Sequence, residues 1–241
     1  MEIVFVVDRT ASMLDVFKPV AKLVHRYVLY AAAEGMDIER VGLVTVDDHY
    51  EHQTTKRGQE YSKEHNGWVA RDSSGGPVIS VSGPPATSYG MTDNLEEFAW
   101  WLERVPIGNG GDPEEAFCCG WWEGRNLSSE GHVWIVTDSY SRGWQRYGGE
   151  SVTPCPLGRD VPDGKANVLM VSGYPLAENL WKKRGHNVVE VERVYTEDSD
   201  GDPVVSLENL RCGGKKLEET MVEVTKDQAG KVTEREALRG I

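Results

Sequence analysis

The order of the apolar segments along the chain predicts an α/β fold built on a mostly parallel sheet. Three runs rich in β-branched residues, 4–7, 41–46 and 132–137, are too short for helices and indicate buried strands, and an aspartate directly follows each. A segment with helical periodicity separates the first two runs, which favours a right-handed unit of parallel strands. We therefore predict a Rossmann-like, doubly wound sheet with helices on both faces and an antiparallel edge strand.

The loop after the first strand has an oxygen-bearing side chain at every second position: Asp8, Thr10 and Ser12. Such side chains can turn toward one point at the carboxyl end of the strand, where open α/β sheets bind ligands. One carboxylate and two hydroxyls suit Mg²⁺, Mn²⁺ or Ca²⁺ and are poor ligands for zinc or copper. Ser12 is also a good N-cap for a following helix, so both interpretations stay open.

The segment after this loop has the spacing of a long helix. Apolar residues recur every three or four positions from Met13 to Ala31, and Gly35 can end the helix. Pro19 is unfavourable inside a helix. Either the helix begins near Asp15 and Pro19 lies in its first turn, or the helix is kinked at Pro19.

Residues 49–89 differ in composition from their surroundings. They are polar and rich in Gly and Ser, with breakers at 75–77 and 83–85. Short alternating pieces at 53–56 and 78–81 predict an edge strand and a hairpin arm. We expect an irregular insertion that carries the antiparallel edge.

Two acidic segments predict the starts of further helices. Asp93 and Glu96 have the spacing of a capping box ahead of the apolar positions in 95–102. A glycine-rich loop at 108–111 leads into Asp112, which Pro and two Glu follow before an apolar helical segment that reaches about residue 122. Asp at an N-cap with Pro behind it is a typical helix start. Because a glycine-rich loop also lets the backbone approach a ligand, capping and metal binding by Asp112 both stay open.

The third strand places another acid at the same edge, because Asp138 follows it as Asp8 follows the first. Beyond it we predict a strand over 167–172, a helix over 175–183 and a strand over 187–195. These elements define a domain over 1–195 with the insertion at 49–89, and an extension over 196–241 that packs on this domain or follows it. The acids at 197–202 lack the glycine position of a calcium loop and predict a solvated turn, whereas the tail after Gly213 fits a helix or a hairpin.

Composition excludes several classes of function. A net charge of −13 argues against binding of nucleic acid, which needs clustered Lys and Arg. No run is long enough to span a membrane and no signal peptide is evident, so we expect a cytoplasmic protein unless a leader has been removed. The four cysteines contain no Cys-x-x-Cys pair and predict reduced thiols. In the pairs 100–101 and 121–122, two adjacent Trp cannot both face one core, so one of each pair is expected at the surface or between helices.

Three separated motifs together resemble the von Willebrand factor A family, which includes the integrin inserted domains. Asp8-x-Thr10-x-Ser12 resembles the family's first metal-adhesion loop, with Thr in the first hydroxyl position. Gly110-Gly111-Asp112 is similar to a variant second loop, and Val136-Thr137-Asp138 to the third. The resemblance covers about residues 1–195.

The resemblance implies a metal-ion-dependent adhesion site that holds Mg²⁺, with Mn²⁺ or Ca²⁺ as alternatives, and binds a protein partner. The implied ligands are Asp8, Thr10, Ser12, Asp112 and Asp138. Many intracellular members work beside ATPases in multi-protein systems. Three ionised acids outweigh the charge of the ion, so we expect either that Asp112 or Asp138 acts through water, or that the partner's ligand is not simply an acid.

We expect a binding module and not an enzyme. The alternatives are a metal-dependent phosphohydrolase with Asp8 as nucleophile, and a scaffold that binds partners without metal. Against the first, Thr10 stands where such an enzyme would have a second acid. Arg9, Tyr140 and Arg142 adjoin the ligand loops and are the expected partner contacts.

Overall fold

A six-stranded mixed sheet forms the centre of the protein. The computed structural model describes residues 1–10, 13, 16–47, 59–62, 67–71, 77–80, 85–105, 114–129, 131–141, 155, 158–171, 175–191, 194–197, 203–206, 211–212 and 215–239. In spatial order the strands are β11 (Asn187–Val191), β10 (Asn167–Val171), β8 (His132–Thr137), β1 (Glu2–Asp8), β2 (Arg40–Val46) and β6 (Ala86–Thr92). All neighbours are parallel except β2 and β6, which confirms the predicted sheet with its antiparallel edge.

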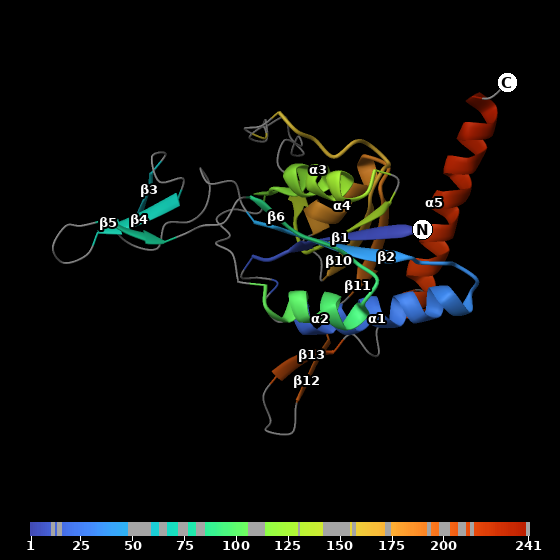
Figure 1. Ribbon diagram of the computed structural model, residues 1–241, viewed down its shortest axis with the longest axis horizontal. Helices are drawn as coiled ribbons and strands as arrows, with labels where there is room; N and C mark the ends of the chain where they lie inside the picture. The colour runs from blue at the N-terminus through green and yellow to red at the C-terminus, as the bar shows by residue number, and fades with distance from the viewer. Residues whose placement is uncertain are drawn as a thin grey trace.

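Helices cover both faces of this sheet (Figure 1). On one side lie α1 (Phe17–Ala33) and α2 (Leu95–Glu103), and on the other α3 (Phe117–Leu127) and α4 (Pro175–Lys183). Alternate residues of β1 point to the two sides: Phe5 belongs to the core beneath α1, and Val6 to the core beneath α3. Burial on both faces explains why β1 is continuously apolar instead of alternating.

The first residues of α1 and α2 show which of the predicted helix starts are correct. Helix α1 begins at Phe17, so Pro19 lies in its first turn, and the N-cap position is occupied by Val16. Helix α2 has Asn94 as its N-cap, and the Asn94 side chain accepts hydrogen bonds from the backbone of Glu96 and Glu97. The predicted capping box at Asp93 is therefore displaced by one residue.

Helix α3 begins later than predicted. Its N-cap is Ala116, which makes no side-chain cap, and Glu114–Glu115 form the short strand β7. β7 pairs in parallel with β9 (Tyr140–Ser141), and the Ala116 N–H donates to the Asp47 carbonyl at 3.1 Å. The predicted helix start at Asp112 is wrong because these pairings hold the following residues extended.

The predicted insertion contains a small sheet of its own. The strands β3 (Gln59–Ser62), β4 (Gly67–Arg71) and β5 (Pro77–Ser80) pair antiparallel, and Figure 1 shows this sheet apart from the central one. The edge of the central sheet is β6, which lies at the end of the predicted range. The piece at 53–56 lies outside the described residues.

The C-terminal part ends in a long helix. The strand predicted over 187–195 is divided, since β12 (Val194–Glu197) pairs with β13 (Pro203–Ser206) and not with the central sheet. A second short pair, β14 (Arg211–Cys212) and β15 (Lys215–Lys216), leads into α5 (Leu217–Arg239). α5 excludes the hairpin alternative, and its buried residues Leu217 and Met221 join the core beneath α1. The acids at 198–202 lie outside the described residues.

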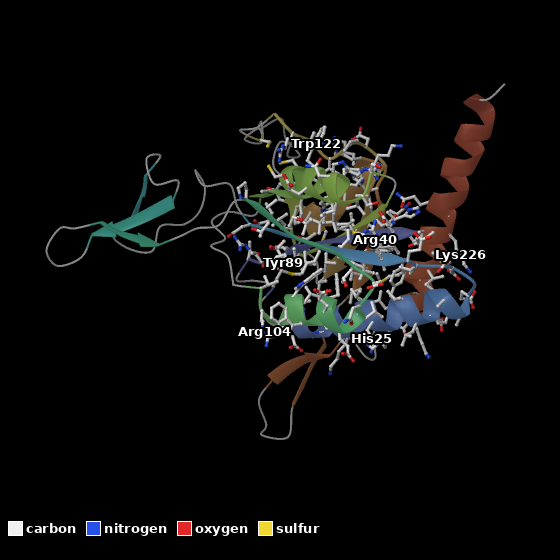
Figure 2. The ribbon with its side chains drawn as sticks, in the orientation of Figure 1. His25, Arg40, Tyr89, Arg104, Trp122 and Lys226 are labelled. Carbon is white, nitrogen blue, oxygen red and sulfur yellow. The ribbon has the colours of Figure 1, made fainter. Side chains whose placement is uncertain are left out.

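The adjacent Trp residues separate as predicted. Trp121 is buried, whereas Trp122 is 47% exposed on the outer side of α3 (Figure 2). On α2 the exposed member is Trp100, with the Arg104 guanidinium 4.5 Å from its ring centre. Among the helices described, none has both the length and the apolar composition needed to cross a membrane.

Candidate functional site

Three neighbouring strands bring acids to one edge of the sheet. Asp8 is the last residue of β1 and pairs with Val46 of β2, so that Asp47 follows on the neighbouring strand. On the other side Val7 pairs with Val136 of β8, and Asp138 comes directly after that strand. Parallel strands in register therefore place these acids at the carboxyl edge, where open α/β sheets bind ligands.

The Asp8 carboxylate is fixed from both sides by hydroxyl groups. Its Oδ1 accepts hydrogen bonds from the Thr10 N–H at 2.9 Å and from the Thr10 hydroxyl at 2.6 Å. Its Oδ2 accepts a hydrogen bond of 3.0 Å from the Thr137 hydroxyl, which in turn accepts one from the Ser139 N–H at 2.7 Å. The loop after β1 and the end of β8 thus hold one buried carboxylate in a single orientation.

The electrostatics of Asp8 are those of a buried acid beside another acid. Burial, and then the nearby Asp138 charge, raise the pKa of Asp8 to about 7, although the hydrogen bonds from Thr10 and Thr137 act to lower it. Within the described residues its hydrogen-bond donors are all neutral. A buried carboxylate is costly without a compensating positive charge. The oxygen-rich donor set therefore fits a hard divalent cation.

Arg9 does not supply that charge, because it pairs with another acid. Its Nη2 lies 3.4 Å from Asp47 Oδ2, and the two side chains are 6% and 1% exposed. The backbone fixes both residues: the Arg9 N–H donates to the Val46 carbonyl and the Asp47 N–H to the Pro85 carbonyl. The expected placement of Arg9 at the rim is wrong, because its guanidinium neutralises Asp47 inside the protein.

Tyr140 is also buried, contrary to its expected role as a surface contact. Its side chain is fully enclosed in the core beneath α3 and α4, together with Phe117 and Trp181. The loop before it is held by the Trp181 indole, which donates to the Ser139 carbonyl at 2.9 Å. The β7–β9 pairing further joins Glu114 to Tyr140. The segment after the glycine-rich loop and the segment after Asp138 therefore lie side by side.

Comparison with known proteins gives only distant similarity. No family model matches the chain, and no curated protein sequence matches it. Among solved structures, the vWF domain of the type V pili tip protein Mfa5 from Porphyromonas gingivalis is 14% identical, with a TM-score of 0.33 over 61% of this chain and 40% of that one. The pilus adhesin SpaC from Lactobacillus rhamnosus GG is 14% identical in its open conformation, with a TM-score of 0.37 over 93% of this chain and 23% of that one.

A second structure of SpaC is 13% identical, with a TM-score of 0.40 over 76% of this chain and 26% of that one. The chain thus spans 40% or less of the length of each of these proteins.

The structure brings together part of the predicted ligand set. Asp8 and Thr10 are in direct contact, and Asp138 is near enough for its charge to act on Asp8. Ser12, Asp112 and Arg142 lie outside the described residues and stay predictions. Since α3 begins at Phe117, N-capping no longer accounts for Asp112.

Sequence reasoning did not identify the side-chain contacts that Thr137 and Asp47 make at this edge of the sheet. Thr137 was quoted only as part of a motif, although its hydroxyl contacts Asp8 directly. Asp47 ends a buried strand as Asp8 does, and this repeated pattern marked it as a residue of the same edge. Its pairing with Arg9 could not be read from the sequence, because it depends on how the two loops pack.

Proposed function

We propose that the chain is a von Willebrand factor A-like module that binds a protein partner through a divalent cation at the carboxyl edge of its sheet. The observation that carries this proposal is the buried Asp8 carboxylate, oriented by neutral donors and adjacent to a second acid. The proposed ion is Mg²⁺, with Mn²⁺ or Ca²⁺ as alternatives. The proposed ligands are Asp8, Thr10, Ser12, Asp112 and Asp138.

The hydrogen bonds at Asp8 support a preorganised ligand. Donors on both carboxylate oxygens prevent the side chain from turning when an ion arrives, so little order has to be gained on binding. The Thr137 hydroxyl, which is not a proposed ligand, is an outer-shell contact of the kind that orients metal ligands and contributes to affinity. The bound ion would supply the positive charge that this buried acid needs.

The partial exposure of Asp138 supports an ion that a partner can reach. Asp8 is fully buried, whereas Asp138 is half-buried in the loop after β8. An ion held between them would have one side toward protein and one toward solvent. A partner oxygen on the open side would complete its coordination, and the excess of acids favours a neutral oxygen or a water-mediated contact over a direct carboxylate.

A phosphohydrolase is less well supported by the same geometry. An enzyme with an aspartyl nucleophile needs a second acid two residues on for proton transfer, but Thr10 stands there and its hydroxyl donates to Asp8. We therefore propose a binding role and no hydrolytic one. The partner that we propose is a protein of a multi-component system, such as one that contains an ATPase.

Calorimetric titration of the full chain with Mg²⁺ and Mn²⁺ tests the proposal. We expect saturable binding by the wild type, none by Asp8→Ala, and unchanged binding by the control Asp93→Ala, which removes an exposed carboxylate before α2. A wild type that binds neither ion would contradict the metal-dependent function and favour the metal-free scaffold.

A further inference from the structure

A cluster of three cysteine side chains lies outside the site described above. Cys118 and Cys119 lie in the first turn of α3, and Cys155 comes from the long connection between β9 and β10. Their three sulfur atoms all lie within 4.8 Å of one another, and Cys119 Sγ is 3.8 Å from Cys155 Sγ. All three side chains are buried. The fold thus brings a cysteine 36 residues away onto an adjacent pair.

Among the described residues, the apolar side chains packed with these sulfurs are small. The three cysteines and Ala116 form a separate small core, with Ala86 packed against it. This group is distinct from the two large aliphatic and aromatic cores beneath α1 and α3. Three sulfur atoms therefore lie close together in the interior, away from bulk water.

The spacing of the sulfurs fits a metal better than a disulfide. Thiolates about 2.3 Å from a zinc ion lie roughly 3.8 Å apart in a tetrahedral site and roughly 4.0 Å apart in a trigonal one. The 3.8 Å between Cys119 and Cys155 matches the tetrahedral value, and the limit of 4.8 Å leaves only a small contraction for the third sulfur. A disulfide would need the sulfurs at about 2.05 Å and would leave the third thiol unused.

The position on α3 also favours bound thiolates. Cys118 and Cys119 are the second and third residues of a helix that runs to Leu127. The amino end of a helix carries partial positive charge, which stabilises thiolates placed there. Three thiolates around a divalent ion have an excess of one negative charge, and this end of α3 partly offsets it.

We propose that Cys118, Cys119 and Cys155 form a binding site for a thiophilic divalent cation of the Zn²⁺ type. This site differs in chemistry from the oxygen site at Asp8 and does not depend on the function proposed for that site. The ion joins the first turn of α3 to the connection between β9 and β10. Local spacing does not indicate this site, because the pair and the third cysteine are far apart along the chain.

Competitive titration of the reduced, metal-free full chain with Zn²⁺ against a chromogenic chelator tests this site. We expect one ion per chain, with affinity reduced by more than roughly tenfold in Cys119→Ser and in Cys155→Ser, because loss of a ligand costs more than loss of an outer-shell contact. Cys212→Ser is the matched control, since Cys212 belongs to β14 beside α5, and should bind as the wild type does. Asp8→Asn should also leave Zn²⁺ binding unchanged.

Thiol alkylation of the wild type gives a second readout that needs no variant to fold. Because the three thiols are buried, the readout is the rate of alkylation: Zn²⁺ should slow it at three of the four cysteines relative to the metal-free chain. Cd²⁺ in place of Zn²⁺ should give a thiolate charge-transfer band in the ultraviolet. Absence of Zn²⁺ binding by the wild type, or equal binding by Cys155→Ser, would overturn the proposal. Mild oxidation that joins Cys119 to Cys155 in a chain without Zn²⁺ affinity would overturn it in favour of a redox pair.

Discussion

The Thr137 hydroxyl donates a hydrogen bond of 3.0 Å to Asp8 Oδ2, and this contact links the ends of two adjacent strands. The same hydroxyl accepts the Ser139 N–H, so Thr137 positions both the carboxylate and the loop that contains Asp138. The geometry of the candidate site therefore depends on a residue that offers no ligand of its own in our proposal.

Replacement of Thr137 by Val should destabilise the protein by about 1–3 kcal/mol, because Asp8 Oδ2 loses the hydrogen bond from the Thr137 hydroxyl and the Ser139 N–H loses its acceptor. The matched control is Thr45→Val on β2. Thr45 is also fully buried, but its hydroxyl has no hydrogen-bond partner among the described residues, so its loss should be neutral or stabilising. Urea unfolding of both variants measures the difference, and equal destabilisation would contradict the assigned role of Thr137.

Gly120 allows α3 to pack closely on the sheet. A Cβ at this position would lie 2.6 Å from the Val6 Cγ1 and would also clash with Val46. Since both neighbours are β-branched and stiff, Gly120→Ala should cost about 1–3 kcal/mol of unfolding free energy.

Gly124, one turn further along α3, provides the control for this prediction. A Cβ there would come no closer than 3.4 Å to any side chain, which is ordinary contact. Gly124→Ala should be neutral or stabilise the helix by about 0.5–1 kcal/mol. Thermal unfolding that ranks the two variants in the opposite order would refute the close approach.

Thr225 links α5 to the core by hydrogen bonds with two aromatic side chains. Its hydroxyl donates to the Met221 carbonyl at 2.9 Å and accepts from the Trp134 indole at 3.3 Å and from the Tyr27 hydroxyl at 2.9 Å. Thr225→Val removes the acceptor that the two aromatic donors share and should cost about 1–3 kcal/mol.

The same substitution at Thr220 tests whether the loss of unfolding free energy in Thr225→Val comes from the hydrogen bonds of Thr225. Thr220 lies on the same helix and its hydroxyl donates only to the Lys216 carbonyl, at 3.2 Å. Thr220→Val should change the free energy of unfolding by less than about 0.5 kcal/mol. Chemical denaturation in which both variants lose the same stability would argue against the proposed link of α5 to the core.

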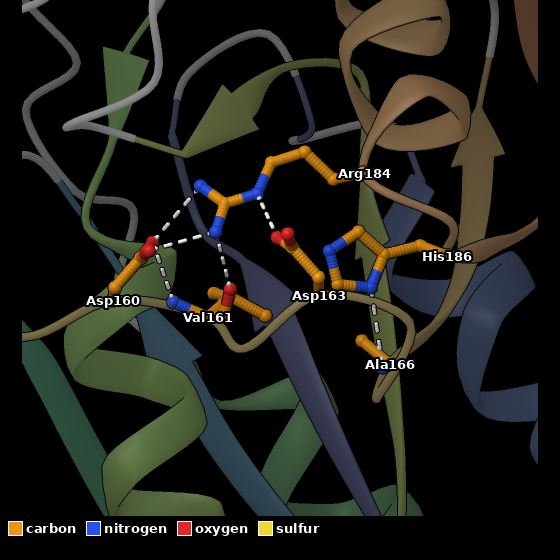
Figure 3. Close-up of polar contacts among 6 residues, drawn as sticks. All are labelled: Asp160, Val161, Asp163, Ala166, Arg184 and His186. Atoms are coloured by element: carbon orange, nitrogen blue, oxygen red, sulfur yellow. Dashed lines mark hydrogen bonds and ion pairs between the residues drawn. The ribbon is translucent and has the colours of Figure 1, made fainter.

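His186 should make stability depend on pH. Burial, and then the charge of Arg184, lower the pKa of His186 from 6.5 to about 4. Figure 3 shows Arg184 held by Asp160 and Asp163, while His186 Nδ1 accepts the Ala166 N–H at 3.3 Å. Between these two pKa values the unfolded chain binds more protons, so stability should fall as the pH is lowered from 6.5 to 4, by about 3 kcal/mol at most.

Comparison with His186→Asn isolates this effect, because the Asn side-chain oxygen can replace the acceptor Nδ1. The raised pKa of Asp8 gives the opposite slope, since its stabilising neutral form is lost as the pH rises toward 7, but both proteins share this contribution. The wild type should therefore lose stability relative to the variant as the pH falls. A difference that stays constant from neutral pH to about pH 4 would exclude a titrating His186.

The centre of the main sheet could be predicted because β1, β2, β8 and β10 are buried on both faces. Continuous apolar runs such as 3–7 in β1 are typical of strands between layers of helices, and the aspartates that end the runs of β1, β2 and β8 mark the carboxyl edge. The helix over 175–183 was also predicted at its observed bounds, because it has a strong apolar periodicity and a proline at its first residue.

The incorrect predictions concern residues whose place depends on long-range pairing. Arg9 and Tyr140 adjoin the ligand loops in sequence, but an ion pair with Asp47 and packing beneath α3 turn them inward. The helix-start signals at Asp112 do not determine where α3 begins. The helix begins only after the residues of β7, which pair with β9. The cysteine cluster similarly depends on a contact between Cys119 and Cys155 that no local spacing reveals.

The most direct test of the account compares the unfolding free energies of the wild type and Asp8→Asn, in a chelator and in saturating Mg²⁺, above the raised pKa of Asp8. In the chelator the variant should be the more stable protein, because it buries an amide in place of an uncompensated charge. Mg²⁺ should reverse this order by stabilising only the wild type, by about 2.7 kcal/mol at a hundred times the dissociation constant. An equal effect of Mg²⁺ on both proteins, or none on either, would contradict a cation site at Asp8.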